Sequence, residues 1–385
     1  MRRVNFKLKQ FFKIEFNANR IFGLDILRAM AILFVVVHHS QNYLPNAVYK
    51  YISIFILDGV SIFFVLSGFL IGGILIKQFQ KEDITFKTLV TFWTRRWFRT
   101  LPNYFLILVL LLTLSGLFYS DFSILNYYKY FIFSQNIFSV HPRFFMEAWS
   151  LSIEEWFYLM LPILLFLFSK SKISVVKSII FTTLIVIIGV TLLRYIRYST
   201  MPIDNSMVWD NVFRKQVITR MDSLMFGVFG AYLYYYHGIF WHRFRIQFLV
   251  IGLLLFAVVR THLFHFRMTD FRLYECVFSF SLESLATLCV LPFLSSIVKG
   301  QGFLFRAITY ISIISYSMYL VNYTLVQHWI INYMNWTTMS HWSVTFTYVV
   351  KYILFWGLTI VISGLLYKYY ERPVMNLRDY IKINR

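Results

Sequence analysis

Long apolar runs separated by short polar ones make up most of the chain. A helix needs about 20 apolar residues to cross the hydrocarbon core of a bilayer. Windows of that kind centre on 26–44, 52–76, 101–119, 149–168, 174–193, 217–236, 246–260, 275–298, 307–334 and 345–369. The window at 246–260 is the weakest, and 124–138 is a candidate for an extra or re-entrant piece. The pattern predicts an all-α polytopic membrane protein with about ten transmembrane helices.

Composition supports the membrane assignment. Hydrophobic residues make up 59% of the 385 positions and charged residues 14%, which is more apolar surface than a soluble chain of this length can bury. Polar stretches are too short for a second folded domain. No internal repeat is visible, which disfavours a transporter built from inverted halves. We expect a basic cytoplasmic segment at 1–20, one transmembrane domain at 21–373 and a cytoplasmic tail at 374–385.

The charge balance is strongly basic, with 37 Lys and Arg residues against 17 Asp and Glu. Most of the basic residues fall in alternate loops, so their excess predicts topology rather than nucleic-acid binding. This distribution of basic residues among the loops predicts that both termini lie in the cytoplasm. We expect the chain to be in the cell membrane, that is, the cytoplasmic or inner membrane. The outward loop 194–220 runs against the rule, since it carries Arg194, Arg197, Arg214 and Lys215.

The first predicted span contains an arginine and two adjacent histidines, which are costly inside a bilayer unless they face protein, water or a ligand. The eleven residues from Arg28 to His39 come within roughly 20° of three full helical turns and rise about 16 Å. Arg28 and His39 therefore share a face with Asp25, while His38 points elsewhere. Two other interpretations stay open: Arg28 pairs with Asp25 or extends to the interface, and His39 is a hydrogen-bonded interior group.

A pair of carboxylates lies about one and a half turns into the fourth predicted span, in "AWSLSIEEWFYLMLP" (148–162). This span enters from the outside, so Glu154 should lie at the depth of His39, where the two could form the pair that general base catalysis on a hydroxyl requires. Glu155 points about 100° away, toward the interface or a neighbouring helix. The alternative is a structural ion pair between one of these glutamates and Arg28 or Arg220.

Three arginines precede the third span, in an inner loop that reads "FWTRRWFRTLPNYF" (92–105). Arg95 and Arg99 are four residues apart and share a helical face, with Arg96 beside them. Guanidinium groups at the cytoplasmic interface suit bidentate recognition of phosphate. Topology determinants and lipid head-group anchors have the same composition, so that interpretation also stays open.

The chain resembles the acyltransferase-3 family of integral membrane acyltransferases. The resemblance rests on "DGVSIFFVLSGFLIGG" (58–73), "FWTRRWFRTLP" (92–102), "WSLSIEEWFYLMLP" (149–162), "RMDSLMFGVFGA" (220–231), "ISYSMYLVN" (314–322) and "ERP" (371–373), in that order. It implies that Arg28 and His39 occupy the family's critical pair, Glu154 its carboxylate, and Arg95, Arg96 and Arg99 its basic cluster. Where the family often has histidine, this chain has Asn322, which can still donate and accept hydrogen bonds.

Residues and resemblance together predict an O-acyltransferase that moves an acyl group, acetyl above all, from acyl-CoA to a hydroxyl of cell-surface or lipid-linked carbohydrate. His39, assisted by Glu154, is expected to act as base, and the donor is expected to contact Arg28, Arg95, Arg96 and Arg99. We predict no metal site and no permanently bound cofactor, since acetyl-CoA is a donor substrate. The expected partners are acyl-CoA, a carbohydrate or glycolipid acceptor and membrane lipids. A polytopic transporter or flippase of a glycan or small metabolite, without acyl transfer, is the alternative.

Overall fold

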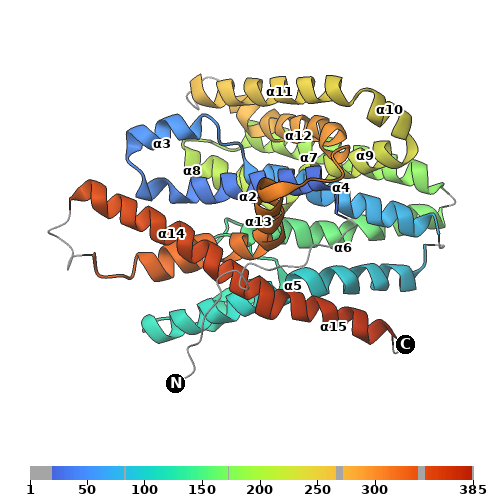
Figure 1. Cartoon of the computed structure of the whole chain (residues 1–385). Helices are drawn as coiled ribbons and strands as arrows, with labels where there is room; N and C mark the ends of the chain where they lie inside the picture. Colours follow the sequence, from blue (N-terminus) through green and yellow to red (C-terminus); the bar gives the residue numbers. More distant parts are fainter. Residues whose placement is uncertain (1–19, 82–83, 172, 266–271, 337–342, 384–385) are drawn as a thin grey trace.

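Helices form all the regular structure in the part of the chain that the structure describes, and no strand occurs there. The computed structural model describes residues 20–81, 84–171, 173–265, 272–336 and 343–383. Most of the long helices run in roughly the same direction, with short helices and loops at both ends of the bundle (Figure 1). This is the all-α architecture that the hydropathy pattern predicts.

Eight helices in the described residues are long and apolar enough to cross a membrane. They are built on α2 (Phe22–His39), α4 (Gly59–Phe79), α5 (Phe86–Phe118), α6 (Ala148–Lys170), α7 (Val175–Thr200), α12 (Ser279–Ser295), α13 (Gly302–Val321) and α14 (Val344–Leu366). The remaining predicted windows, 217–236 and 246–260, coincide with α9 (Met221–Tyr236) and α11 (Arg245–His265). Each of the ten windows therefore overlaps a helix, and eight of these helices have spanning length and composition.

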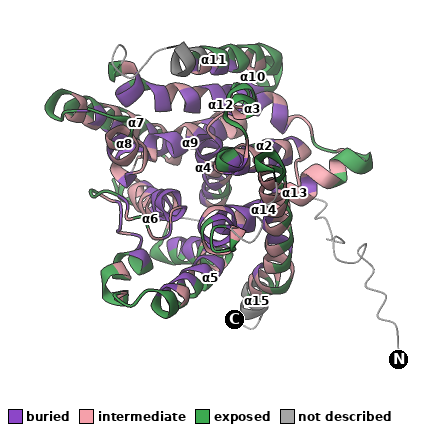
Figure 2. Cartoon of the chain, turned by 90° about the vertical axis from the view of Figure 1, so that its left-hand side faces the viewer, coloured by how far each residue is buried: buried purple, intermediate pink, exposed green. Residues whose placement is uncertain are grey.

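Helices α4 and α9 pack against each other through glycines in the interior of the bundle. A Cβ atom added at Gly68 would lie 1.8 Å from the carbonyl oxygen of Leu224, and one added at Gly227 would lie 2.0 Å from that of Val65. Contacts this close leave no room for a side chain, so the two backbones meet directly. Figure 2 shows α4 and α9 largely buried, whereas α5, α7, α11 and α14 carry exposed residues on their outer sides.

Helix α5 begins earlier than the third predicted window, so the arginine cluster lies on a helix and not in the expected loop. Arg95, Arg96 and Arg99 do not lie in a loop, because the helix runs unbroken from Phe86 to Phe118. A capping box fixes its start, in which Thr85 and Thr88 exchange side-chain to backbone hydrogen bonds. The polar character of this first half hid it from a hydropathy window. The arginines are therefore held on a helix that continues into the apolar segment.

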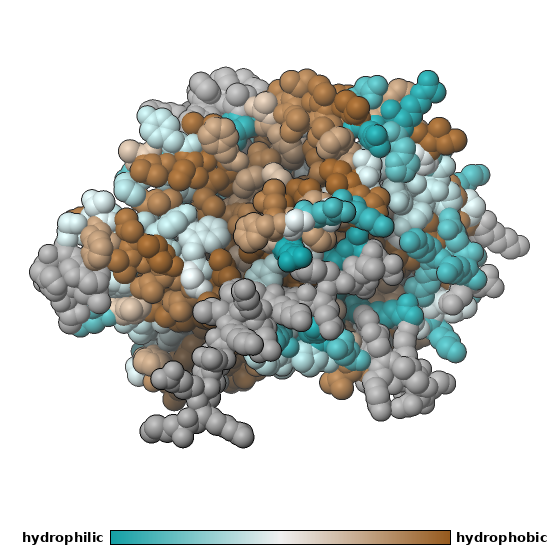
Figure 3. Space-filling model, in the orientation of Figure 1, coloured by the Kyte–Doolittle hydropathy of each residue, from teal (hydrophilic) through white to brown (hydrophobic). Residues whose placement is uncertain are grey.

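The two ends of the bundle differ in character. In Figure 1, α3 (Asn46–Ser53) and α8 (Ser206–Trp209) lie at the left-hand end, and α10 (Gly238–Arg243) and the C-terminal helix α15 (Arg372–Ile383) lie toward the right. On the face seen in Figure 3, hydrophilic residues gather toward the right-hand end. The segment 124–138 is described throughout and adds no spanning helix, since its regular structure is the 3-10 helix η2 (Ile124–Ile132).

Candidate active site

A crevice between α2, α4, α5, α6 and α13 brings most of the predicted site residues together. Its space measures about 820 Å³, including the part that is open to solvent. The wall residues on α4 extend from Val60 to Leu70, which corresponds to about 15 Å along the helix. The crevice is lined by Arg28, Val60, Phe63, Phe64, Ser67, Leu70, Arg96, Arg99, Thr100, Ser150, Leu151, Glu154, Ser312, Ile313, Ser315, Tyr316, Tyr319 and Glu371.

Two arginines that line the crevice, Arg28 and Arg99, form few interactions with other residues of the protein. Arg99 is exposed and makes no hydrogen bond or ion pair with another described residue. Arg28 lies 3.7 Å from Asp25, as their spacing predicts. Asp25, however, is already satisfied by Arg20, whose Nε lies 2.9 Å from its carboxylate, and by Ser312, which donates to it at 2.7 Å. Since Asp25 has these nearer partners, the guanidinium of Arg28 remains available to a ligand in the crevice.

A carboxylate from the last sequence motif also reaches the crevice. Glu371 ends η8 (Tyr367–Glu371) and accepts hydrogen bonds of 2.7 Å from Asn103 and Ser317. These contacts tie the C-terminal part of the chain to α5 and α13. Glu371 belongs to the "ERP" motif, which by itself indicates no place for this residue in the site.

The Glu154 carboxylate belongs to the crevice wall and does not contact His39. It accepts hydrogen bonds from Ser67 at 2.8 Å and from Tyr158 at 2.9 Å. Arg96 donates to the hydroxyl of Tyr158, stacks over its ring at 4.2 Å and lies 4.0 Å from Glu154. Arg96 is therefore engaged by protein groups, and the two residues organise one wall of the crevice.

Glu155 points into α5 rather than toward the interface. It is buried, and Thr100 donates to it at 2.8 Å. Its contact with a neighbouring helix is one of the two placements that the helix geometry left open.

His39 pairs with Asn322, the residue that stands where the family often has histidine. Its Nδ1 lies 2.5 Å from Oδ1 of Asn322. The amide of Asn322 can be oriented from its other contacts, because Nδ2 donates to the carbonyls of Met318 at 2.8 Å and Tyr319 at 2.9 Å. Oδ1 is then the end that faces His39, and an amide oxygen only accepts. Nδ1 of His39 must carry the hydrogen, which leaves Nε2 with the lone pair of a base.

The two histidines of α2 have different surroundings, as the helical spacing predicts. His38 is exposed, and its Nδ1 lies 3.0 Å from the hydroxyl of Tyr49. The ring of His39 instead packs against that of Tyr323, with 4.7 Å between centroids. His39 is therefore the histidine that shares its surroundings with α13 and the segment that follows it.

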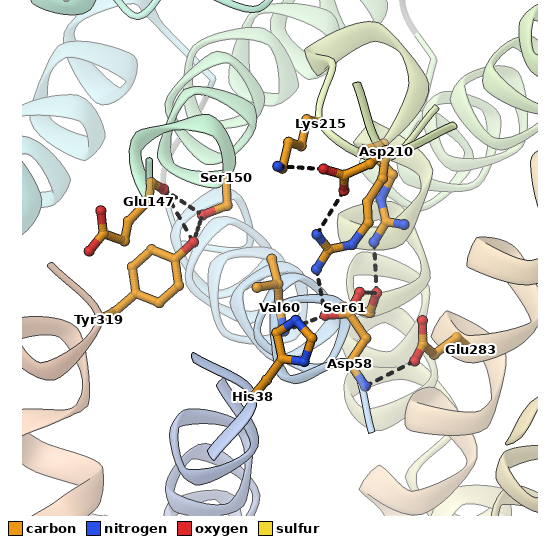
Figure 4. Close-up of polar contacts among 12 residues, drawn as sticks. His38, Asp58, Val60, Ser61, Glu147, Ser150, Asp210, Lys215, Glu283 and Tyr319 are labelled. Carbon is orange, nitrogen blue, oxygen red and sulfur yellow. Dashed lines mark hydrogen bonds and ion pairs between the residues drawn. The ribbon is translucent and has the colours of Figure 1, made fainter. Parts of the chain in front are cut away.

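The crevice and the His39–Asn322 pair meet at the start of α6. Figure 4 shows the hydroxyl of Tyr319 turned toward Ser150 and the backbone of Glu147. The Tyr319 and Ser150 hydroxyls lie 2.6 Å apart, and Tyr319 also donates to the carbonyl oxygen of Glu147 at 3.2 Å. Tyr319 lines the crevice and lies three residues before Asn322 on the same run of helix. His39 thus lies just beyond the Ser150 and Tyr319 end of the crevice.

Ion pairs, one of them fully buried, engage much of the basic loop that ran against the positive-inside count. Arg194 is fully buried and lies 2.7 Å from Asp222. Arg214 bridges Asp58 at 3.4 Å and Asp210 at 3.2 Å, and Lys215 contacts Asp210 at 2.5 Å. Three of the four basic residues named for this loop are therefore paired within the protein, so they say little about which side of the membrane the loop occupies.

Asp58 shows how strongly these pairs interact. Burial by itself would raise the pKa of its carboxyl, but Arg214 and Arg220 outweigh that cost. Together with hydrogen bonds from Ser61 and the N–H of Val60, they hold the pKa of Asp58 below its usual range. Figure 4 shows Asp58, Ser61 and His38 on one side of this cluster and Asp210 and Lys215 on the other.

The structure thus gathers some predicted site residues and separates others. The crevice is lined by Arg28, Arg96, Arg99 and Glu154. Arg95 is exposed and does not line it, and His39 lies beyond its Tyr319 end. The expected contact between His39 and Glu154 is replaced by the contact between His39 and Asn322.

Fold and site together define a multi-pass helical membrane protein with a partly basic crevice that leads toward a histidine–amide pair. The chain belongs to the acyltransferase-3 family: the family's model, described as an acyltransferase domain, matches residues 21–368. It is similar to the O-acetyltransferase OatA of Staphylococcus aureus, in strain NCTC 8325 / PS 47 and in strain COL, at 27% identity over 378 residues in each case. Each alignment covers 91% of this chain and 57% of the relative, so the chain spans little more than half the length of these relatives. No solved structure matches the chain.

Proposed function

We propose that this chain is an acyl-CoA-dependent O-acyltransferase that moves an acyl group, acetyl above all, to a hydroxyl of a cell-surface or lipid-linked carbohydrate. One observation carries the proposal: a single crevice is lined by the arginines Arg28 and Arg99 and by Tyr319, which lies three residues before Asn322, the partner of His39. Membership of an acyltransferase family and similarity to proteins named O-acetyltransferase support the same chemistry.

Donor binding would begin at the arginines. Arg99 is exposed at the crevice and Arg28 is left available by the other partners of Asp25, so both can pair with donor phosphates. Arg96 would act indirectly, because Tyr158 and Glu154 already engage it. Arg95 contributes to the basic surface outside the crevice. In this proposal ten helices cross the cell membrane, and both termini and Arg99 face the cytoplasm, where acyl-CoA is available.

His39 would be the catalytic base. Asn322 holds the hydrogen on Nδ1, so Nε2 can accept the proton of an acceptor hydroxyl. The oxygen then attacks the thioester carbonyl, the carbon–sulfur bond breaks, and the departing thiolate takes a proton from the His39 imidazolium. The alternative order, in which Nε2 attacks first and carries the acyl group, uses the same nitrogen. Glu154 would assist from the crevice wall by fixing Arg96 and Ser67 along the path of the thioester arm.

Incubation of the purified chain with radiolabelled acetyl-CoA and total cell-envelope glycan tests the proposal. We expect label to move to the carbohydrate fraction in the presence of the wild-type chain and not with His39→Ala. A transporter or flippase without acyl transfer would move a glycan or small metabolite across vesicles and leave the label on coenzyme A. That result would overturn the assignment.

A further inference from the structure

Glu147 is a buried carboxylate that the reaction outlined above does not use. Its residue exposure is 2%, and it forms no ion pair with the described residues. Its oxygens instead accept hydrogen bonds from one short stretch of chain. Oε1 accepts from the backbone N–H of Tyr323 at 3.0 Å and of Thr324 at 2.7 Å, and Oε2 accepts from the hydroxyl of Thr324. A carboxylate buried without a cation is expensive unless such donors satisfy it.

These donors lie at the junction where α13 passes into the π-helical segment η6 (Asn322–Ile331). In a regular α-helix the N–H of residue 323 would bond to the carbonyl of residue 319. Here the carboxylate of Glu147 provides an acceptor for the N–H of Tyr323, and the side chain of Asn322 provides a donor for the carbonyl of Tyr319. Glu147 therefore satisfies the N–H group, and Asn322 the carbonyl group, at the same break in the helical pattern.

Two residues that contact His39, Asn322 and Tyr323, are attached to this junction. Asn322 contacts Nδ1 of His39, and the ring of Tyr323 packs against the imidazole. Figure 4 shows the carboxylate of Glu147 pointing away from Tyr319 and Ser150, toward which its backbone is turned. Thr324 strengthens the attachment, because its hydroxyl oxygen also accepts from the N–H of Met146 at 3.1 Å. A shift of Glu147 would move the two groups that orient His39.

We propose that Glu147 is a positioning residue that fixes the orientation and tautomer of His39 through Asn322. The proposal rests on the proposed function for its kinetic consequence, but its structural consequence can be measured without any acyl transfer. Glu147 acts here as a hydrogen-bond acceptor for backbone N–H groups. It does not need to contact either substrate.

A double-mutant cycle with Asn322 tests whether Glu147 acts through that amide. We expect Glu147→Ala to lower kcat on the order of tenfold to a hundredfold, since a misplacement of about 1 Å has effects of that size, with the KM for acetyl-CoA unchanged. If the two residues act through one path, adding Glu147→Ala to Asn322→Ala should cost about twofold or less. Losses that multiply in the double variant would overturn the proposal.

Glu147→Gln is the matched control. The glutamine keeps an oxygen that can accept from both N–H groups, so kcat should stay within about threefold of the wild type. A role for the negative charge itself would make the Gln and Ala variants equally poor. That outcome would also contradict a positioning role, and it is readable even if the Ala variant folds badly.

Carbethoxylation by diethyl pyrocarbonate, followed by mass spectrometry of the His38–His39 peptide, gives the readout that needs no activity. In Glu147→Ala the rate at His39 should rise severalfold, as in Asn322→Ala, because the ring loses its anchor, while His38 keeps its rate as the internal reference. An unchanged rate at His39 would overturn the proposal. If the rate rises but the wild type transfers no acetyl group, positioning stands and the proposed function fails.

Discussion

At the scale of single residues, the adjacent histidines of α2 illustrate how helix position decides chemistry. His38 and His39 differ by one residue, yet the first is exposed beside Tyr49 and the second is held by Asn322. His39→Ala should therefore lower acetyl transfer on the order of a hundredfold or more, the contribution of a general base. His38→Ala should keep most of the activity, with both variants inserted at the wild-type level. Equal losses in transfer assays of the two variants would mean that the helical face carries no information about function.

The arginines of α5 provide a second comparison between neighbours. Arg99 lines the crevice without a protein partner, and Arg95 is exposed outside it. Lysine cannot replace a bidentate guanidinium, and a charged hydrogen bond contributes roughly 1.5–3 kcal/mol. Arg99→Lys should raise the KM for acetyl-CoA about tenfold, while Arg95→Lys should leave it nearly unchanged. An unchanged KM for acetyl-CoA in Arg99→Lys would indicate instead that the cluster binds lipid head groups or sets the topology.

Sequence alone could predict contacts along one helix better than contacts between helices. The spacing of Arg28 and His39 follows from 100° per residue, and the place of Asp25 beside Arg28 follows equally. The depth of Glu154 could be predicted from its position in the span, but not the direction in which α6 faces α2. The carboxylate of Glu154 consequently contacts Ser67 and Tyr158. Asn322, and not Glu154, lies beside His39.

At the scale of elements, the contact between α4 and α9 depends on the absence of side chains. A Cβ atom at Gly68 would lie 1.8 Å from a backbone oxygen, which no rotamer change can relieve. Gly68→Ala should therefore lower the free energy of unfolding by about 1–3 kcal/mol, the usual cost of overpacking. Thermal unfolding of the detergent-solubilised chain would measure this.

Gly189 on α7 is the control for that substitution. Nothing lies within 4 Å of a Cβ atom added there. Because alanine is favoured over glycine in a helix by about 1 kcal/mol, Gly189→Ala should be neutral or stabilising. If both variants lose the same stability, the close approach of α4 and α9 would not explain the effect of Gly68→Ala.

The elements also show which boundaries a hydropathy window can predict. It located the eight helices of spanning length among the described residues, because crossing a bilayer requires a continuous apolar run of about 20 residues. It missed the first half of α5, where capping by Thr85 and amphipathic composition extend the helix beyond the apolar core. It likewise could not predict the break between α13 and η6, where two N–H groups donate to Glu147, the residue before α6.

At the scale of the whole molecule, basic residues that indicate membrane topology have to be distinguished from those that are paired with acidic residues. Basic residues that pair with buried acids, such as Arg194 with Asp222, contribute little to a topology count. Arg99 lines the crevice, and hydrophilic residues gather toward the right-hand end of the face in Figure 3. The sequence could predict the excess of positive charge but not all of its pairing, because Asp58 and Asp222 are distant in sequence from the arginines that they contact.

Membrane vesicles of known orientation provide the most direct test of the central claim, that acyl-CoA enters at the arginine end and the acyl group leaves beside His39. Radiolabelled, membrane-impermeant acetyl-CoA would be supplied outside the vesicles. The orientation of each vesicle preparation would be determined by labelling single cysteines placed at Lys81 or Asn205. We predict transfer to carbohydrate only in vesicles that expose Lys81, and none with His39→Ala. Equal transfer in both orientations, or transfer undiminished by His39→Ala, would contradict the account.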